Sequence, residues 1–374
     1  MRKSNKPLVS LDEIALIPTS LSNVDSRKDI NPFDENGKLP VFVAPMTCIV
    51  DKSNYDLFNS KSYAVLPVRP DSYFGTANLS KGWFACPFDH FKQLAVKAEE
   101  SKKLDEGEYF ICVDMANGHM IHLYDYVKKF KCYYPNAKVM VGNIANPYTY
   151  AECCRSGVDY VRIGIGGGNG CITSVRTGFH NSAVNMLETI AEIRQNVEAG
   201  DYGSGVTITK VVADGGIDNI GKAIKCLALG ADYVMMGRLF AQCEESVAKK
   251  YHVTSMDDLR IWVRDDFLIA SKDLEKKLAA IERPYVRNEK VWVKEYYGQA
   301  SEQGQLDRFG MIKSAPEGVT VYVPMEGTYD DFMHLFESYL RSAMSYNGSF
   351  TLEDFIGKVD YEVQTLAEFN SYNK

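Results

Sequence analysis

One cysteine ends a glycine-rich segment. The stretch YVRIGIGGGNGCITSVRTG (160–178) runs from β-branched residues into five glycines within seven positions, and then reaches Cys171 and Thr173. Most cysteines are small buried hydrophobic residues, as we expect of the other eight, which lie inside strand or helix patterns. A cysteine on an exposed loop can instead be reached by backbone amides that stabilise its thiolate. We therefore interpret Cys171 as a nucleophile, with Thr173 either relaying a proton or capping the following turn.

The glycines of this segment could serve a ligand or only the loop itself. A dinucleotide-binding fingerprint is not predicted, because no GxGxxG opens directly into a helix with an acid about twenty residues on. Glycines also let backbone carbonyls or amides face an anion, or a hard cation such as potassium, at close range. A loop that needs positive φ for its own geometry is the alternative.

Two later segments suit a sugar phosphate. ADGG places Asp214 before glycines, and MGR joins Gly237 to Arg238. Phosphate sites of barrels usually form after late strands, where the amides of Gly216 and Gly237 with Arg238 would fit a phosphate monoester. Asp214 would accept hydrogen bonds from sugar hydroxyls. A helix N-cap at Asp214 and an exposed cation at Arg238 are the alternatives.

Seven short apolar runs must position these residues. They lack polar alternation, as parallel strands buried on both faces do. They span residues 39–46, 63–68, 109–116, 138–144, 160–165, 210–216 and 232–238. Helical patterns lie between them, and residues 185–200 place Met186, Ile190 and Ile193 on one face before a glycine stop.

This repeat predicts an α/β fold, a single (β/α)8 barrel domain over residues 1–374. The position of the eighth strand is not determined by the sequence, since residues 291–298 are either that strand or part of an excursion. We expect a helical excursion at about 244–290 and a mobile flap at about 298–318. Polar and glycine residues that follow barrel strands share the C-terminal rim, so the candidate residues should converge on one pocket.

Composition excludes several classes of function. The net charge of −7, with scattered lysines and arginines, argues against a nucleic-acid partner. Nine irregularly spaced cysteines predict reduced thiols in the cytoplasm rather than a disulfide framework. The basic start lacks an apolar segment behind it, and no run of eighteen apolar residues occurs, so we expect neither export nor a membrane partner.

Ordered motifs over nearly the entire chain resemble the IMP dehydrogenase and GMP reductase family, purine-nucleotide oxidoreductases on a (β/α)8 barrel. They are LDEIALIP, APMT, VDMANGH, VGNIA, RIGIGGGNGCIT, VVADGGI, GADYVMMG, YYGQAS, APEG and LRSAMSY. The resemblance implies that a cysteine attacks C2 of the purine and that a hydride moves between that carbon and NAD or NADP. It also implies a homotetramer. A regulatory CBS module is not expected, since only about forty residues separate Arg69 from Phe110.

The resemblance assigns a role to each candidate. It implies catalytic roles for Cys171, Thr173 and Arg308, the last as a flap arginine that activates water. It implies that nine residues bind the substrate: Met46, Asn169, Asp214, Gly216, Gly237, Arg238, Tyr296, Gln299 and Glu317. It implies cofactor contacts for Asp114, Asn143 and Gly164, and a potassium site made by the carbonyls of Gly166, Gly168 and Cys171.

Two reactions are compatible with the resemblance. LDRFG keeps Arg308 and Phe309 of a dehydrogenase flap but lacks its tyrosine, and Ile312 stands where a reductase carries a glutamate. ANG at 116–118 is reductase-like. We expect NAD-dependent oxidation of IMP to XMP. NADPH-dependent conversion of GMP to IMP and ammonia, a catalytically silent nucleotide binder and a flavin-dependent phosphate-binding barrel are the alternatives.

Departures from the family concentrate at one subsite. Family serines that contact the phosphate are replaced by Ala44, Asn169 and Arg238. We hypothesise a rewired phosphate site in which the arginine supplies a charge-assisted contact. The family Met-Gly that faces the purine is replaced by Gln299 and Ala300, which leaves the base specificity open.

Overall fold

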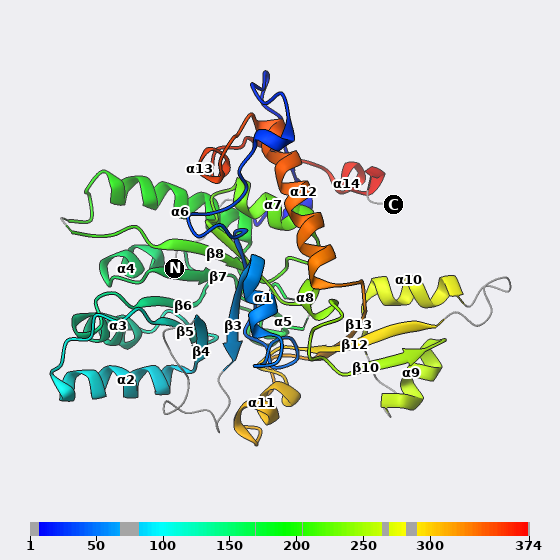
Figure 1. Ribbon diagram of the computed structural model, residues 1–374, viewed down its shortest axis with the longest axis horizontal. Coiled ribbons are helices and arrows are strands. Elements are labelled where there is room, and N and C mark those ends of the chain that lie inside the picture. The colour runs from blue at the N-terminus through cyan, green and yellow to red at the C-terminus, as the bar shows by residue number, and fades with distance from the viewer. Residues whose placement is uncertain are drawn as a thin grey trace.

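Eight parallel strands close into a barrel in the computed structural model (Figure 1). The structure describes residues 7–67, 82–168, 170–203, 205–263, 269–281 and 290–372. In order around the barrel the strands are β2 (Val41–Val43), β3 (Tyr63–Pro67), β4 (Trp83–Cys86), β5 (Phe110–Asp114), β6 (Lys138–Ile144), β7 (Tyr160–Ile163), β8 (Lys210–Asp214) and β9 (Tyr233–Met236). Strand β9 pairs with β2 and closes the barrel. The predicted (β/α)8 fold is confirmed.

The eighth barrel strand is β4, which the sequence analysis missed. Its four residues, WFAC, are all buried and pair with both β3 and β5. A four-residue apolar segment between Gly82 and Pro87 is too short to show a period of its own. The other candidate, 291–298, lies outside the barrel.

Helices cover the outside of the barrel (Figure 1). They are α1 (Tyr55–Lys61), α2 (Phe88–Ser101), α3 (Ile121–Tyr133), α4 (Thr149–Arg155), α6 (Ala183–Glu198), α7 (Ile220–Ala228), α8 (Arg238–Ala241) and α12 (Tyr329–Asn347). In α6 the predicted apolar face is buried at Met186, Ile190 and Ile193. The side chain of Ser182 caps this helix by accepting a hydrogen bond from Val184 N.

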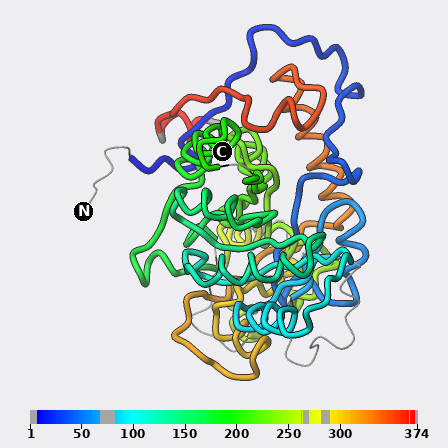
Figure 2. Tube along the Cα trace, turned by 90° about the vertical axis from the view of Figure 1, so that its left-hand side faces the viewer, coloured from blue at the N-terminus to red at the C-terminus, as the bar shows by residue number. Residues whose placement is uncertain are grey.

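A strand near the start of the described chain pairs with a strand near its end. Strand β1 (Ile14–Leu16) pairs antiparallel with β14 (Tyr361–Val363). The short helices η1 (Leu11–Glu13), η2 (Arg27–Asp29), α13 (Leu352–Phe355) and α14 (Leu366–Tyr372) accompany this pair. Figure 2 shows these blue and red segments together at one end of the molecule. None of the described helices has both the length and the apolar composition of a membrane span.

Aromatic rings close one end of the barrel. Phe42 of β2 packs against the rings of Tyr63, Trp83, Tyr160 and Tyr233 at centroid distances of 5.1 to 6.0 Å. Each of these four partners is the first residue of its strand. This aromatic floor therefore fills the N-terminal end of the barrel, which leaves the C-terminal end for the predicted site.

A second sheet is inserted between α8 and α12. Its strand order is β10 (Lys250–Val253), β12 (Val291–Tyr297), β13 (Thr320–Pro324) and β11 (Ile269–Ala270). With α9 (Met256–Val263) and α10 (Lys272–Ile281) it forms the inserted lobe, to the right of the barrel in Figure 1. The lobe has a small core of its own, made of Val253, Leu259, Leu274, Leu278, Val293 and Tyr322.

The inserted lobe adds detail to two sequence expectations. The excursion at 244–290 contains two helices, but it also contains strands β10 and β11, because residues such as Val253 pack against α9 and α10 as part of a sheet. Residues 264–268 and 282–289 of it lie outside the described residues. The predicted flap, between β12 and β13, carries a helix, α11 (Glu302–Phe309), that is capped by Ser301.

Candidate active site

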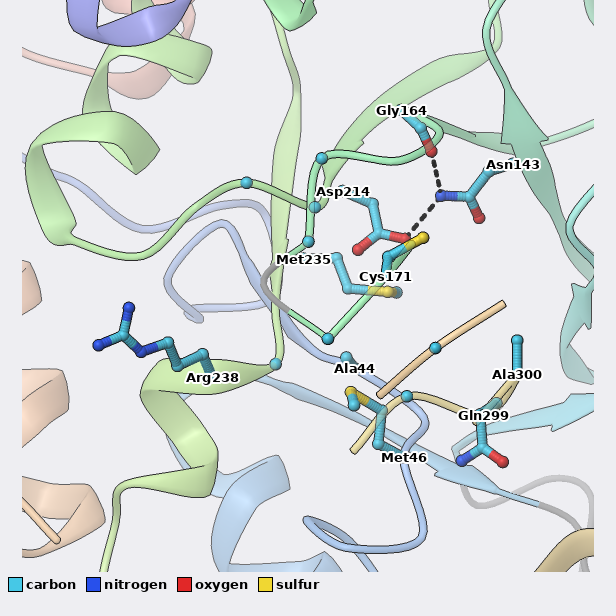
Figure 3. A pocket seen from close by; sticks show the side chains of 18 of the residues that line it. Ala44, Met46, Asn143, Gly164, Cys171, Asp214, Met235, Arg238, Gln299 and Ala300 are labelled. Carbon is cyan, nitrogen blue, oxygen red and sulfur yellow. Dashed lines mark hydrogen bonds between the residues drawn. The ribbon is translucent and has the colours of Figure 1, made fainter. Parts of the chain in front are cut away.

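The predicted residues gather at the C-terminal end of the barrel, in one pocket (Figure 3). Those that line it are Met46, Asp114, Asn143, Gly164, Gly166, Gly168, Cys171, Asp214, Gly216, Gly237, Arg238, Tyr296, Gln299 and Glu317. Thr173 lines an adjacent cavity that shares Glu317 with the pocket. Asn169 lies outside the described residues.

The cysteine loop is fastened to the start of β13. Ile172 N donates to Glu317 O at 2.8 Å, and Val319 N donates to Gly170 O at 2.9 Å. A side chain at Gly318 would approach Gly170 O to 2.9 Å, so a glycine allows the two segments to lie this close. The pairing fixes the position of Glu317 relative to the residues that follow Cys171.

Three side chains then form a hydrogen-bonded chain. The Cys171 thiol donates to Thr173 Oγ1 at 3.3 Å, and the Thr173 hydroxyl donates to Glu317 Oε2 at 2.8 Å. The direction of both bonds leads a proton from the sulfur towards the carboxylate. This relay can generate a thiolate and can return the proton to a leaving group near the sulfur.

Arg162, which the sequence analysis did not select, holds two predicted acids together. Its Nη1 contacts Asp114 Oδ1 at 2.7 Å, and its Nη2 contacts Asp214 Oδ2 at 2.8 Å. Asn143 Nδ2 also donates to Asp214 Oδ2, at 2.9 Å. The side-chain hydrogen bonds that Asp214 accepts from described residues thus converge on Oδ2, and among these residues none donates to Oδ1. A charged residue inside the buried run YVRI was the only sequence signal for this role.

Asp114 lies between two arginines, Arg162 and Arg308. Burial alone would raise the pKa of its carboxyl, but the charges of Arg162 and Arg308 outweigh burial and lower the pKa below its ordinary value. The pKa of Arg162 is raised well above its ordinary value, because its two carboxylate partners outweigh the effect of burial. Both groups are therefore charged at neutral pH.

Asn143 depends on a close approach of two strands. At Gly142 an added side chain would meet Arg162 Cβ at 2.6 Å and Arg162 O at 2.7 Å, and the residue has φ of +151°. The β6–β7 register shifts between Val141 and Ile144. Only glycine fits this crossing, and it directs Asn143 towards Gly164 O and Asp214, as Figure 3 shows.

Arg308 lies in α11 and contacts the acid network rather than the sulfur. Its Nη1 is 3.2 Å from Asp114 Oδ2, and its side chain is largely buried. It is not among the described residues that line the pocket. The helix that carries it is held by buried Gln305, whose amide bonds to Ser314 O and to Lys313 N.

A larger cavity of about 920 Å³ adjoins the pocket. Thr173 and Glu317 form part of its wall, and His119, Phe179 and His180 form another part. His119 Nε2 accepts hydrogen bonds from Ala145 N and Asn146 N, at 3.0 and 3.2 Å. Burial lowers the pKa of His119, so this imidazole is neutral at pH 7.

Comparison with known proteins agrees with this arrangement. The family model "IMP dehydrogenase / GMP reductase domain" matches residues 94–259. The chain is 28% identical over 374 aligned residues to a GMP reductase of Streptococcus pyogenes serotype M49 (strain NZ131), with 96% of this chain and 95% of the relative covered. The residues matched by the family model make up less than half of the chain, and over them the chain is similar to the IMP dehydrogenase / GMP reductase family. The resemblance drawn from the motifs is confirmed, and the similarity indicates an oxidoreductase.

Two further similar proteins of the family are also GMP reductases. One, from Staphylococcus carnosus (strain TM300), is 28% identical, with 96% of this chain and 97% of the relative covered. The other, from Lacticaseibacillus paracasei (strain ATCC 334), is 26% identical, with 96% of each chain covered. These relatives agree better with the reductase alternative than with the dehydrogenase that the sequence analysis favoured.

Two side chains that line the pocket hold buried polar atoms that have no partner among the described residues. They are Arg238 Nε and Gln299 Oε1. In Figure 3 Arg238 and Gln299 lie on opposite sides of the pocket, and the Arg238 guanidinium points away from Cys171. One is a cationic donor and the other a neutral acceptor. Both atoms are fully buried, so neither is presented to the open pocket.

Two of the carbonyls that the family resemblance assigns to a potassium site already accept hydrogen bonds from the loop itself. Gly166 O already accepts a hydrogen bond from Ser174 Oγ at 3.3 Å, and Gly168 O accepts one from Cys171 N at 2.9 Å. The loop thus keeps its shape through its own donors. The potassium site stays a prediction.

Proposed function

We propose that this chain is a GMP reductase, which converts GMP to IMP and ammonia with NADPH as the reductant. The observation that carries the proposal is the relay from Cys171 through Thr173 to Glu317. Loss of ammonia from C2 of guanine needs a proton on the departing nitrogen. The relay ends beside the nucleophile and can deliver one.

The relay supports a balanced sequence of steps. Proton transfer through Thr173 leaves a thiolate on Cys171 and a neutral acid on Glu317. The thiolate forms a C–S bond at C2, and the C2–N bond breaks as Glu317 returns the proton through Thr173, so that ammonia departs. Bound NADPH supplies a hydride to C2, after which the C–S bond breaks and the thiolate is regenerated.

The position of Arg308 supports reduction over oxidation. A dehydrogenase must activate water to hydrolyse its covalent intermediate, which was the role predicted for Arg308. In the structure its guanidinium is paired with Asp114, with 3.2 Å between Nη1 and Oδ2, and is thereby held at the acid network. The relay therefore offers the better supported proton chemistry, and it suits a leaving amine.

The pocket suits a purine nucleotide. Gln299 lines the pocket, and its Nε2 donates to Pro45 O at 2.9 Å, which holds the side chain in place beside the site. Asp214 Oδ1 can accept from the ribose hydroxyls. Gly216 and Gly237 line the pocket and can offer their backbone amides to the phosphate.

The adjacent cavity suits the nicotinamide half of NADPH. Its volume of about 920 Å³ is in the range of cofactor sites, and its wall includes Thr173 and Glu317 of the relay. His119 and His180 add polar groups to the wall. The predicted cofactor residues Asp114, Asn143 and Gly164 line the Cys171 pocket, so we propose that they act at the junction of the two spaces.

Absorbance at the nicotinamide band tests the function. With GMP and NADPH we expect the absorbance to fall, and with IMP and NAD we expect no change. NADH formation from IMP would overturn the proposal in favour of the dehydrogenase, and silence in both assays would favour a nucleotide-binding relative. Light scattering during gel filtration tests the homotetramer that the family resemblance implies.

A substitution at Glu317 tests the relay. Glu317→Gln should lower kcat about 100-fold or more while the KM for GMP changes little, because a proton donor is lost and the pocket keeps its shape. Glu326→Gln is the matched control, since Glu326 pairs with Lys277 of the inserted lobe. Equal kcat values for the two variants would rule out the relay.

A further inference from the structure

Part of the wall of the larger cavity is held by one imidazole. Residues 145–147 follow β6 and line this cavity, as His119 does. His119 comes from a different segment, the loop between β5 and α3, and its Nε2 accepts the hydrogen bonds of Ala145 N and Asn146 N. One side chain therefore joins two loops of the C-terminal rim of the barrel.

The two backbone donors determine the charge and the tautomer of this ring. A backbone N–H can only donate, so Nε2 must carry a lone pair and the imidazole must be neutral. The ring proton then lies on Nδ1, which donates to Asn117 Oδ1 at 3.0 Å. The same oxygen accepts a hydrogen bond from His119 N at 3.1 Å. A second proton on the ring would turn Nε2 into a donor that faces two donors.

Charged groups surround His119 on several elements, but none of them binds its ring. The titratable groups that share a cavity wall with it, or that pair with one that does, are His122, Asp125, Lys128, Glu152, Arg155, His180 and Glu317. Within the described part of the chain none of these forms a hydrogen bond or an ion pair with the imidazole. Burial is what lowers the pKa of His119 below its ordinary value of 6.5, so protonation begins only in acid.

The segment after β6 has a second contact that does not titrate. Asn181 Nδ2 donates to Ala145 O at 2.8 Å, and Asn181 also lines the larger cavity. Ala145 is thus held through its carbonyl by an amide and through its N–H by His119. Of these two side chains only the imidazole can lose its acceptor, because only the imidazole can gain a proton.

We propose that neutral His119 is a positioning residue for the nicotinamide cofactor. As the acceptor for Ala145 N and Asn146 N it holds the wall against which the cofactor packs, and a proton on Nε2 releases that wall. The inference rests on the proposed cofactor cavity. It gives cofactor binding an acid limit that is set by His119 and not by the relay from Cys171 to Glu317.

Binding of NADPH measures the effect. In a Cys171→Ala background, which prevents turnover, NADPH fluorescence gives the dissociation constant at pH 7.5 and at pH 5.5. With histidine at position 119 the constant should rise about tenfold at the lower pH, because two hydrogen bonds of the wall are lost. His119→Gln keeps an acceptor near the Nε2 position but cannot be protonated, so its constant should be nearly the same at both pH values.

Two more variants and a second measurement complete the test. His119→Leu, which has no acceptor, should bind NADPH about tenfold more weakly at both pH values. His252→Gln is the matched control, since His252 stacks on Trp292 of the inserted lobe and its loss should leave the pH effect intact. Hydrogen exchange of residues 144–148, corrected for the pH dependence of exchange in unfolded chains, should show protection that falls at pH 5.5 with His119 but not with glutamine. Circular dichroism checks that each variant is folded.

The outcomes distinguish this inference from the proposed function. An acid loss of NADPH affinity that His119→Gln abolishes supports the role of His119 even if GMP is not reduced. An equal acid loss in His119→Gln, or protection of the wall that does not change with pH, would overturn the inference. Reduction of GMP by His119→Leu with an unchanged KM for NADPH keeps the function and rejects the positioning role, whereas no binding of NADPH to any of the proteins rejects both.

Discussion

At the scale of residues, the nine cysteines differ mainly in burial. Cys171 is partly exposed and Cys132 is exposed, whereas the other seven are buried. Burial raises the pKa of six of these thiols, those of Cys48, Cys86, Cys112, Cys153, Cys226 and Cys243. Reactivity should therefore follow position in the fold rather than residue type.

Alkylation of the native protein tests this difference. Iodoacetamide should modify Cys171 and Cys132, and GMP should protect Cys171 alone, because the nucleotide covers the pocket. Peptide mass spectrometry measures both sites, with Cys132 as the internal control. Equal protection of the two cysteines would contradict the assignment of Cys171 to the substrate pocket.

Asp114 predicts a pH dependence of stability. Its pKa in the folded protein lies below the ordinary value of 3.8, so the ionised carboxylate stabilises the fold above that value. The contribution is lost as the pH falls through the folded pKa. Asp114→Asn should cost about 3 kcal/mol at pH 7, since Arg162 and Arg308 lose a buried partner, and less at pH 3.

Urea denaturation at the two pH values measures this gap. Asp257→Asn is the control, because that carboxylate is exposed beside Arg260 and its loss should change stability little. A gap between wild type and Asp114→Asn that widens towards pH 3 would contradict the direction of the pKa shift.

At the scale of elements, the crossing of β6 and β7 sets the position of Asn143. Gly142→Ala should cost about 1–2 kcal/mol from its backbone conformation and a further 1–3 kcal/mol from the clash with Arg162. Activity should fall as well, because Asn143 shifts. Gly203 also has positive φ, but nothing lies within 4 Å of an added side chain. Gly203→Ala thus isolates the conformational cost, and equal losses in urea denaturation would argue against the clash.

At the scale of the whole molecule, the aromatic floor and the active site occupy opposite ends of the barrel. Phe42→Ala should cost about 3–5 kcal/mol, since it opens a cavity among four rings. The KM for GMP should be unchanged below the unfolding transition. Phe350→Ala, at a ring that is 40% exposed, is the control for denaturation. A large rise in KM for Phe42→Ala would show that the two ends are coupled.

The sequence was informative where signals were local. Buried apolar runs located seven barrel strands, and glycine or polar residues at their ends located most of the pocket. Strand β4 was missed because four residues are too few to show a hydrophobic period. The role of Arg162 was missed because the sequence of a strand that is buried on both faces does not show which of its side chains point into the barrel. The contact of Asp273 with Arg238 was also invisible, since sequence spacing does not encode how an inserted lobe folds back on a barrel.

The fastening of the cysteine loop to β13 has a consequence for the order of assembly. All eight barrel strands end by Met236, whereas Glu317 lies 144 positions after Thr173 and follows the inserted lobe. During synthesis the nucleophile is therefore complete long before its proton partner emerges. Catalytic competence is acquired last, when the returning strand docks, so a chain cut within the lobe would retain the cysteine but lose the means to protonate its leaving group.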